Sequence, residues 1–143
     1  MTQNGTLRFL LMLCMMHGAG NPHHALAQQG INDLWMGGFE DQSPPPWGGV
    51  DLDFMTGDLV IYTVNREIDF HRTSANISDA EGNLLFSTNG AYIANATGDS
   101  MLNGGGLNPS WYTSDHPEGL YISQGCLILP KPETPGIYYL VHS

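Results

Sequence analysis

Apolar residues in this chain occur in short runs, and glycine, proline or asparagine bounds each run. Beyond residue 27 they nowhere recur at helical spacing over a window of about eleven residues. Runs rich in Val, Ile, Tyr and Phe between turn residues are typical of β-strands. We therefore expect an all-β chain of antiparallel hairpins, with a long loop over residues 96–119. The expected strands cover residues 58–64, 74–78, 83–88, 91–95, 125–130 and 136–143.

The expected hairpins share a sequence pattern. TGDLVIYT, residues 56–63, aligns with EGNLLFST, residues 81–88, and a further turn glycine precedes an apolar strand in PGIYYLV, residues 135–141. In each unit the glycine can take the positive φ of a tight turn before a half-buried strand. The pattern favours a repeat architecture.

The turn at residues 78–83 raises the question of a calcium site, because it holds two acids and an asparagine. An EF-type calcium loop places glycine at its sixth position and glutamate at its twelfth. Counted from Asp79, the fourth position is already Gly82 and the twelfth is Gly90. The spacing instead predicts a hairpin turn, in which Asp79 accepts backbone hydrogen bonds and Gly82 is left-handed.

The N-terminus has the composition of a secretory signal peptide. Arg8 precedes an apolar run over residues 9–16, and a small-x-small sequence ends at Ala27. A buried core helix is the alternative, but the run has no polar face. The run is shorter than the roughly 20 residues that span a bilayer, so no transmembrane segment is expected. We expect residues 1–27 to be a signal peptide and the mature protein to be secreted or held at the cell surface.

The chain is acidic, with a formal net charge of −10. All 14 acidic residues follow Ala27, where the basic residues are Arg66, Arg72 and Lys131. Nucleic acid is therefore not an expected partner, since its binding needs clustered basic residues. Cys126 is the one cysteine beyond the signal peptide, so no internal disulfide is expected. Its apolar setting predicts a buried thiol rather than a nucleophile.

Residues 28–50 and 51–143 differ in composition. The first segment is rich in Gly and Pro and predicts an irregular lead-in, with an extended stretch at the prolines 44–46. Its aromatic residues Trp35, Phe39 and Trp47 are expected to pack on a sheet, a ligand-stacking tryptophan pair being the alternative. The second segment holds the expected strands.

Four motifs occur in order in the second segment: LDFMTGDL, ISDAEGNLLFSTNGAYIAN, MLNGGGL and LILPKPETPGIYYLVHS. They resemble the N-terminal region of large secreted bacterial proteins, in which a signal peptide precedes a β-propeller-like repeat domain. Those proteins often end in a sorting or gliding-motility-associated domain. The resemblance covers most of residues 50–143. It implies a propeller-like fold and a secreted or surface role, and it carries over no catalytic residue.

A propeller needs at least about four blades of ~40–50 residues each. The chain would then supply about two blades of an incomplete propeller, as a fragment of a longer protein would. The alternatives are a small β-sandwich and an oligomer that closes by pairing through the exposed edge of the strand YYLVHS.

Residues that could carry chemistry are sparse. The histidines beyond residue 27 lack the spacing of a zinc site, and Asp51 and Asp53 would share one solvated face of a strand. We expect no catalytic residue, no cofactor and no metal. The best candidate ligand site lies between Asp99 and Glu118, where side chains could stack on and bind a sugar, ordinary loop packing being the alternative. The candidate residues are Trp111, Tyr112, Asp115 and His116.

Two functions remain open at this level. The first is an exported, non-enzymatic β-propeller-like segment that serves binding or adhesion at the cell surface, with an unknown protein or carbohydrate ligand. The second is the front part of a secreted propeller enzyme that acts on polysaccharide, with its catalytic residues beyond Ser143. The lack of a catalytic constellation favours the first.

Overall fold

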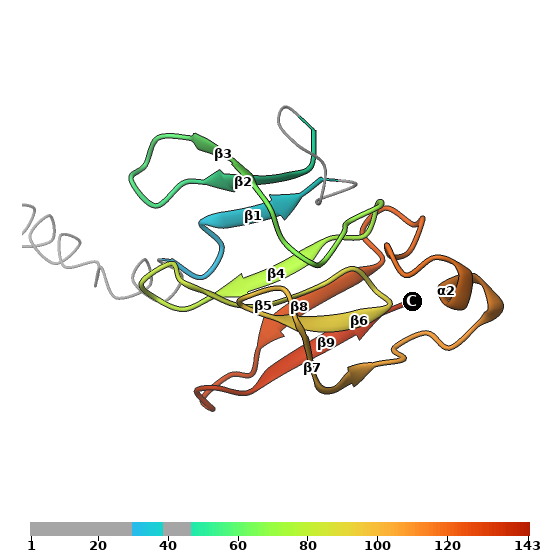
Figure 1. Cartoon of the computed structure of the whole chain (residues 1–143). Helices are drawn as coiled ribbons and strands as arrows, with labels where there is room; N and C mark the ends of the chain where they lie inside the picture. The colour runs from blue at the N-terminus through green and yellow to red at the C-terminus, as the bar shows by residue number, and fades with distance from the viewer. Residues whose placement is uncertain (1–29, 39–46) are drawn as a thin grey trace, which may run out of the picture.

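The computed structural model describes residues 30–38 and 47–143 (Figure 1). The expected signal peptide, residues 1–27, lies outside the described residues, as do Phe39 and the proline run of the lead-in. Strands dominate the described part, which confirms the prediction of an all-β chain. Its elements are β1 (Leu34–Gly37), β2 (Gly49–Asp53), β3 (Val60–Val64), β4 (Ala75–Ser78), β5 (Leu84–Thr88), β6 (Tyr92–Asn95), β7 (Ser100–Gly105), α2 (Trp111–Asp115), β8 (Cys126–Pro130) and β9 (Tyr138–His142).

The strands form three antiparallel sheets, in which neighbours in space are also neighbours in the chain. The first sheet is β1-β2-β3, the second β4-β5-β6-β7 and the third β8-β9. A four-stranded antiparallel meander is the form of a propeller blade. One such sheet between a three-stranded and a two-stranded sheet agrees with a partial propeller of about two blades. Within residues 30–38 and 47–143 the sheets do not close on one another.

The first strands of the three sheets lie together, with β4 in contact with both β1 and β8. They begin at Leu34, Ala75 and Cys126, roughly 40 to 50 residues apart, which is the length of a propeller blade. In Figure 1 β1 lies beside β4, and β2 and β3 extend away from them. The sheets thus follow one another along the chain at the spacing of repeat units, and each begins with the edge strand that lies nearest its neighbouring sheet.

The repeated turn glycines do not mark the same position in each sheet. Gly82 and Gly136 precede β5 and β9, which are the second strands of their sheets, whereas Gly57 precedes β3, a third strand. All three glycines have the expected positive φ, of 85°, 83° and 78° in chain order. The alignment of residues 56–63 with 81–88 therefore matches two hairpins and does not mark a whole blade.

The main core lies between the first and second sheets. Met36 of β1 and Ala94 of β6 pack with Ile68 and Phe70, which come from the connection between β3 and β4. Ile68 and Phe70 are two positions apart, so an extended chain directs both inward. The connection is therefore part of the structure that holds the two sheets together.

A second contact region joins the second and third sheets. Phe86 of β5 meets Tyr138 of β9 edge-on, with ring centroids 5.2 Å apart. Cys126 and Ile128 of β8 are buried beside β4. The middle sheet is thus covered on both of its faces.

The six expected strands are all present, each beginning one or two residues later than expected, but three strands and a helix were missed. β1 and the start of β2 lie in the segment expected to be an irregular lead-in, and β7 and α2 lie in the expected loop over residues 96–119. β7 was missed because its sequence is rich in glycine and lacks the alternation of a strand. Its pairing with β6 is irregular, and its Asn103 has a φ of 60°. No helix in the described part of the chain is long and apolar enough to span a membrane.

Candidate functional site

The four candidate ligand residues lie on α2 and at its C-cap, His116. Ser110 caps the helix: its Oγ accepts a hydrogen bond from the backbone N–H of Thr113, and Thr113 Oγ1 accepts one from the backbone N–H of Ser110. This reciprocal pair is a capping box. The same threonine hydroxyl donates to the carbonyl of Asn108, over 2.5 Å. A five-residue helix is thus held at its start by side chains within the same loop.

Helical geometry sorts the candidate residues into two pairs, because residues four apart share a helix face. Tyr112 and His116 form one pair, with ring centroids 4.4 Å apart. Trp111 and Asp115 form the other, and both are exposed, Trp111 to 76%. The Trp111 ring also meets the Tyr112 ring edge-on at 5.8 Å. The indole of Trp111 is therefore exposed to solvent, while the helix cap and the Tyr112 ring hold its position.

Glu118, which was not among the candidates, orients His116. Its Oε1 lies 2.8 Å from His116 Nδ1 and 4.0 Å from His71 Nδ1. A hydrogen bond from its own backbone N–H and the contact with His116 hold the pKa of this carboxyl below its usual value. A general acid needs a raised pKa near the working pH. Glu118 is instead a charged hydrogen-bond acceptor at neutral pH.

Beyond Glu118 the surface continues to Tyr121 and Arg72. The guanidinium carbon of Arg72 lies 3.8 Å from the centre of the Tyr121 ring, in a cation–π contact. Its Nη2 also donates to the Tyr121 hydroxyl, over 2.8 Å. His71 packs edge-on against the same ring at 4.3 Å. We call this continuous set the α2 surface: Trp111, Tyr112, Asp115, His116, Glu118, His71, Tyr121 and Arg72.

Asn89 holds together the two chain segments that form the α2 surface. Its side chain is fully buried. Nδ2 donates to the carbonyl of Asp69, before β4, and to that of Pro117, after α2, both over 3.1 Å. Oδ1 accepts from the backbone N–H groups of Ala91 and Tyr92. The Asn-Gly turn between β5 and β6 therefore also fixes the position of the site.

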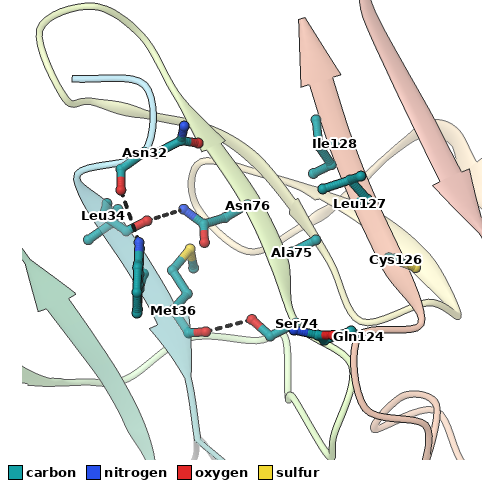
Figure 2. Close-up of a pocket in the computed structure, with 11 residues that line it drawn as sticks. Asn32, Leu34, Met36, Ser74, Ala75, Asn76, Gln124, Cys126, Leu127 and Ile128 are labelled. Carbon is teal, nitrogen blue, oxygen red and sulfur yellow. Dashed lines mark hydrogen bonds between the residues drawn. The ribbon is translucent and has the colours of Figure 1, made fainter. Parts of the chain in front are cut away.

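A groove of about 580 Å³ lies between the first strands of the three sheets (Figure 2). Two polar side chains bond to β1 here: Asn76 Nδ2 of β4 donates to the carbonyl of Leu34 over 2.7 Å, and Ser74 Oγ, just before β4, donates to that of Met36 over 2.5 Å. Because β1 is an edge strand, these bonds supply partners for its outer carbonyls. The groove is a junction between sheets. It is lined by Asn32, Leu34, Trp35, Met36, Ser74, Ala75, Asn76, Gln124, Cys126, Leu127 and Ile128.

The thiol of Cys126 lines this groove and is buried, as expected from its sequence context. Burial raises the pKa of the thiol, and a hydrogen bond with Thr88 opposes that shift without cancelling it. Nucleophilic cysteines need a lowered pKa, because the thiolate is the reactive form. Cys126 therefore has the character of a packed apolar residue.

Asp51 and Asp53 have structural partners. Asp51 Oδ1 lies 2.6 Å from Nη1 of Arg66, whose side chain is 8% exposed. The expectation that Asp51 lies on a solvated face is therefore wrong, because the buried guanidinium needs a counter-charge. Asp53 Oδ1 accepts a hydrogen bond from the backbone N–H of Met55 over 2.8 Å. Both carboxylates stabilise the first sheet.

The turn at Asp79 has the predicted geometry. Asp79 Oδ1 accepts from the backbone N–H groups of Glu81 and Asn83, over 3.0 and 2.8 Å, and Gly82 has a φ of 83°. The side-chain hydrogen bond from Asn83, together with these backbone bonds, lowers the pKa of the Asp79 carboxyl. The loop's own donors occupy the carboxylate. Among the described residues no group of three or more His, Cys, Asp or Glu side chains could hold a metal ion.

Comparisons with protein families, with characterised proteins and with solved structures give no match to this chain. The α2 surface is built from the β3–β4 and β7–β8 connections.

Proposed function

We propose that the chain is an exported, non-enzymatic β-propeller-like segment that binds carbohydrate at the cell surface through the α2 surface. The observation that carries the proposal is Trp111, a residue that is 76% exposed on a capped helix. A large exposed aromatic side chain is informative because its burial against a partner is worth more than that of other side chains. The flat apolar face of a pyranose ring is a fitting partner for an indole.

Polar groups beside Trp111 support this ligand class. Asp115 shares the exposed helix face, and Glu118 carries a charged carboxylate held by His116. Carboxylates accept hydrogen bonds from sugar hydroxyl groups strongly, because charged acceptors form shorter and stronger hydrogen bonds. The Tyr112 ring and the helix cap keep Trp111 in place before binding, which lowers the entropy cost of association.

The charge of the chain favours a neutral glycan. With a formal net charge of −10, the molecule repels polyanions. A binding role is also favoured by the state of the carboxylates and the thiol that a hydrolytic enzyme could use. Asp51 and Asp53 stabilise the first sheet, and the Cys126 thiol is buried.

The test is binding to neutral oligosaccharides of glucose, xylose, mannose and N-acetylglucosamine, measured by isothermal titration calorimetry. We expect one of these to bind and Trp111→Ala to weaken binding at least about tenfold, which corresponds to about 1.4 kcal/mol. Trp47→Ala is the matched control, because Trp47 is 71% exposed and precedes β2 in the first sheet.

Two results would contradict the proposal. One is that none of the four oligosaccharide classes binds to the folded protein. The other is that Trp47→Ala weakens binding as much as Trp111→Ala does, because the α2 surface would then not be the binding site.

A further inference from the structure

Among residues 30–38 and 47–143, no other sheet packs on one apolar face of the third sheet. Two cross-strand pairs form it, Leu127 with Val141 and Leu129 with Tyr139. These four side chains are between 44% and 56% exposed. Paired residues in an antiparallel ladder lie on the same face of the sheet, so the four form one patch. We call this patch the trailing face; the opposite face of the hairpin packs beside β4.

In the part of the chain that the structure describes, one face of the first sheet also carries a row of apolar side chains on which no other sheet packs. Trp35 lies opposite Leu52 and Leu52 lies opposite Ile61, so the three side chains form a row across all three strands. Trp35 is 58% and Ile61 61% exposed. Met36, the neighbour of Trp35, points the other way and is buried in the core with the second sheet. We call the row of Trp35, Leu52 and Ile61 the leading face.

In the middle sheet, by contrast, the two faces are both covered by a neighbouring sheet. The second sheet presents Ala94 toward the first sheet and Phe86 toward the third. Each sheet-on-sheet interface in the molecule thus joins one side of a sheet to the opposite side of the next sheet. The leading and trailing faces are the remaining sides of the first and third sheets, on which no described sheet packs.

Charge also permits these faces to meet. None of the seven side chains that form them is charged, although the chain as a whole carries a net charge of −10. Two copies repel each other where carboxylates face carboxylates, and these faces avoid that cost. Contiguous apolar patches on a protein surface often mark interaction sites, and the described part of the chain presents these two.

We propose that the trailing face of one copy of this chain binds the leading face of a second copy, sheet on sheet. The contact is heterologous, because two different surfaces meet, and it can therefore repeat from copy to copy. If the rotation between neighbouring sheets is maintained, the copies close into a ring of sheets, as propeller blades do. None of the seven face residues belongs to the α2 surface, so separate variants test this association and the proposed glycan binding.

Sedimentation velocity over a hundredfold range of protein concentration tests the proposal. We expect the wild-type chain to associate as its concentration rises. Leu129→Glu, on the trailing face, and Ile61→Glu, on the leading face, should each raise the dissociation constant at least tenfold. Leu102→Glu is the matched control, because Leu102 on β7 is 93% exposed and lies on neither face.

Mixing the two variants separates head-to-tail contact from self-pairing of a single face. Leu129→Glu keeps an intact leading face and Ile61→Glu keeps an intact trailing face. An equimolar mixture should therefore form a one-to-one dimer that neither variant forms alone. Circular dichroism and cooperative urea unfolding of each variant establish that it is folded.

Three outcomes would overturn the proposal. The wild-type chain could stay monomeric over the whole concentration range. Leu102→Glu could disrupt association as strongly as the two face variants, which would indicate nonspecific contact. The mixture could fail to form the dimer, which would show that the two faces do not bind each other.

Discussion

At the scale of single residues, the side chain that does most to position the α2 surface is Asn89, at the start of a turn. Its amide contacts three segments that are distant in sequence: the chain before β4, the β5–β6 turn and the chain after α2. The backbone carbonyl of Asn89 also accepts a hydrogen bond from the backbone N–H of Leu120, over 3.0 Å. Replacing the side chain would leave buried carbonyl and N–H groups without partners, and each such group costs about 1 to 3 kcal/mol.

Asn89→Ala is expected to lower the free energy of unfolding by about 2 to 4 kcal/mol, because it removes both the donor and the acceptor of this buried amide. Urea unfolding followed by circular dichroism measures the change. The control is Asn65→Ala, since Asn65 is exposed and exposed substitutions change stability by only about 0.5 kcal/mol. An equal effect of the two substitutions would show that the Asn89 hydrogen bonds are unimportant for stability.

Residues whose role is local could be predicted from the sequence, and residues whose role is nonlocal could not. Asp79 and Gly82 form their turn within five consecutive positions, so spacing and residue type were sufficient. Asp51 was expected on a solvated face because its partner, Arg66, is 15 residues away and approaches it only when β3 pairs with β2. Glu118 is a mixed case, because its close partner His116 is only two positions away whereas its contact with His71 is nonlocal.

At the scale of elements, α2 was missed because its five residues are shorter than any window in which helical periodicity can be recognised. Its start did have a signal, the Ser-x-x-Thr spacing of residues 110–113 after Pro109. The candidate residues were chosen for their chemistry alone, and the helix explains their arrangement. Tyr112 and His116 meet because they are four positions apart.

Ser110→Ala is expected to free the start of α2. Loss of an N-cap side chain costs about 1 kcal/mol, and a local opening that is easier by this amount is populated about five times more often. Hydrogen exchange of the Ser114 amide, which donates to the Ser110 carbonyl, should accelerate by about that factor. Ser123→Ala, at an exposed position outside the helix, should leave it unchanged. Equal exchange rates in both variants would contradict a capping role for Ser110.

At the scale of the whole molecule, alternating turns and apolar runs predicted the fold class and the order of the hairpins. The number of strands in each sheet could not be predicted. β1 has the sequence LWMG and β7 the sequence SMLNGG, and neither has the alternation of a half-buried strand. Both are strands because a neighbour offers backbone partners, β2 for the first and β6 for the second. Tertiary pairing decided these elements.

The three sheets are expected to unfold as one unit, because the contacts between them include buried side chains and side-chain to backbone bonds. Ile68, which is 0% exposed between the first and second sheets, is the sharpest probe. Ile68→Ala should lower the free energy of unfolding by about 2 to 5 kcal/mol, whereas Ile68→Val should cost about 0.5 to 1.5 kcal/mol, since less cavity is left.

The measurement uses the double variant Trp47→Phe and Trp111→Phe as background, so that Trp35 alone among the described tryptophans reports on the first sheet. Circular dichroism follows all sheets at once. If Ile68→Ala shifts the fluorescence and dichroism transitions together, the first sheet depends on its packing against β4 and on the bonds from Asn76 and Ser74. If the Trp35 transition separates from the dichroism transition in wild type and variant alike, the first sheet unfolds by itself. The sheets would then be independent units, and Ile68 would only connect them.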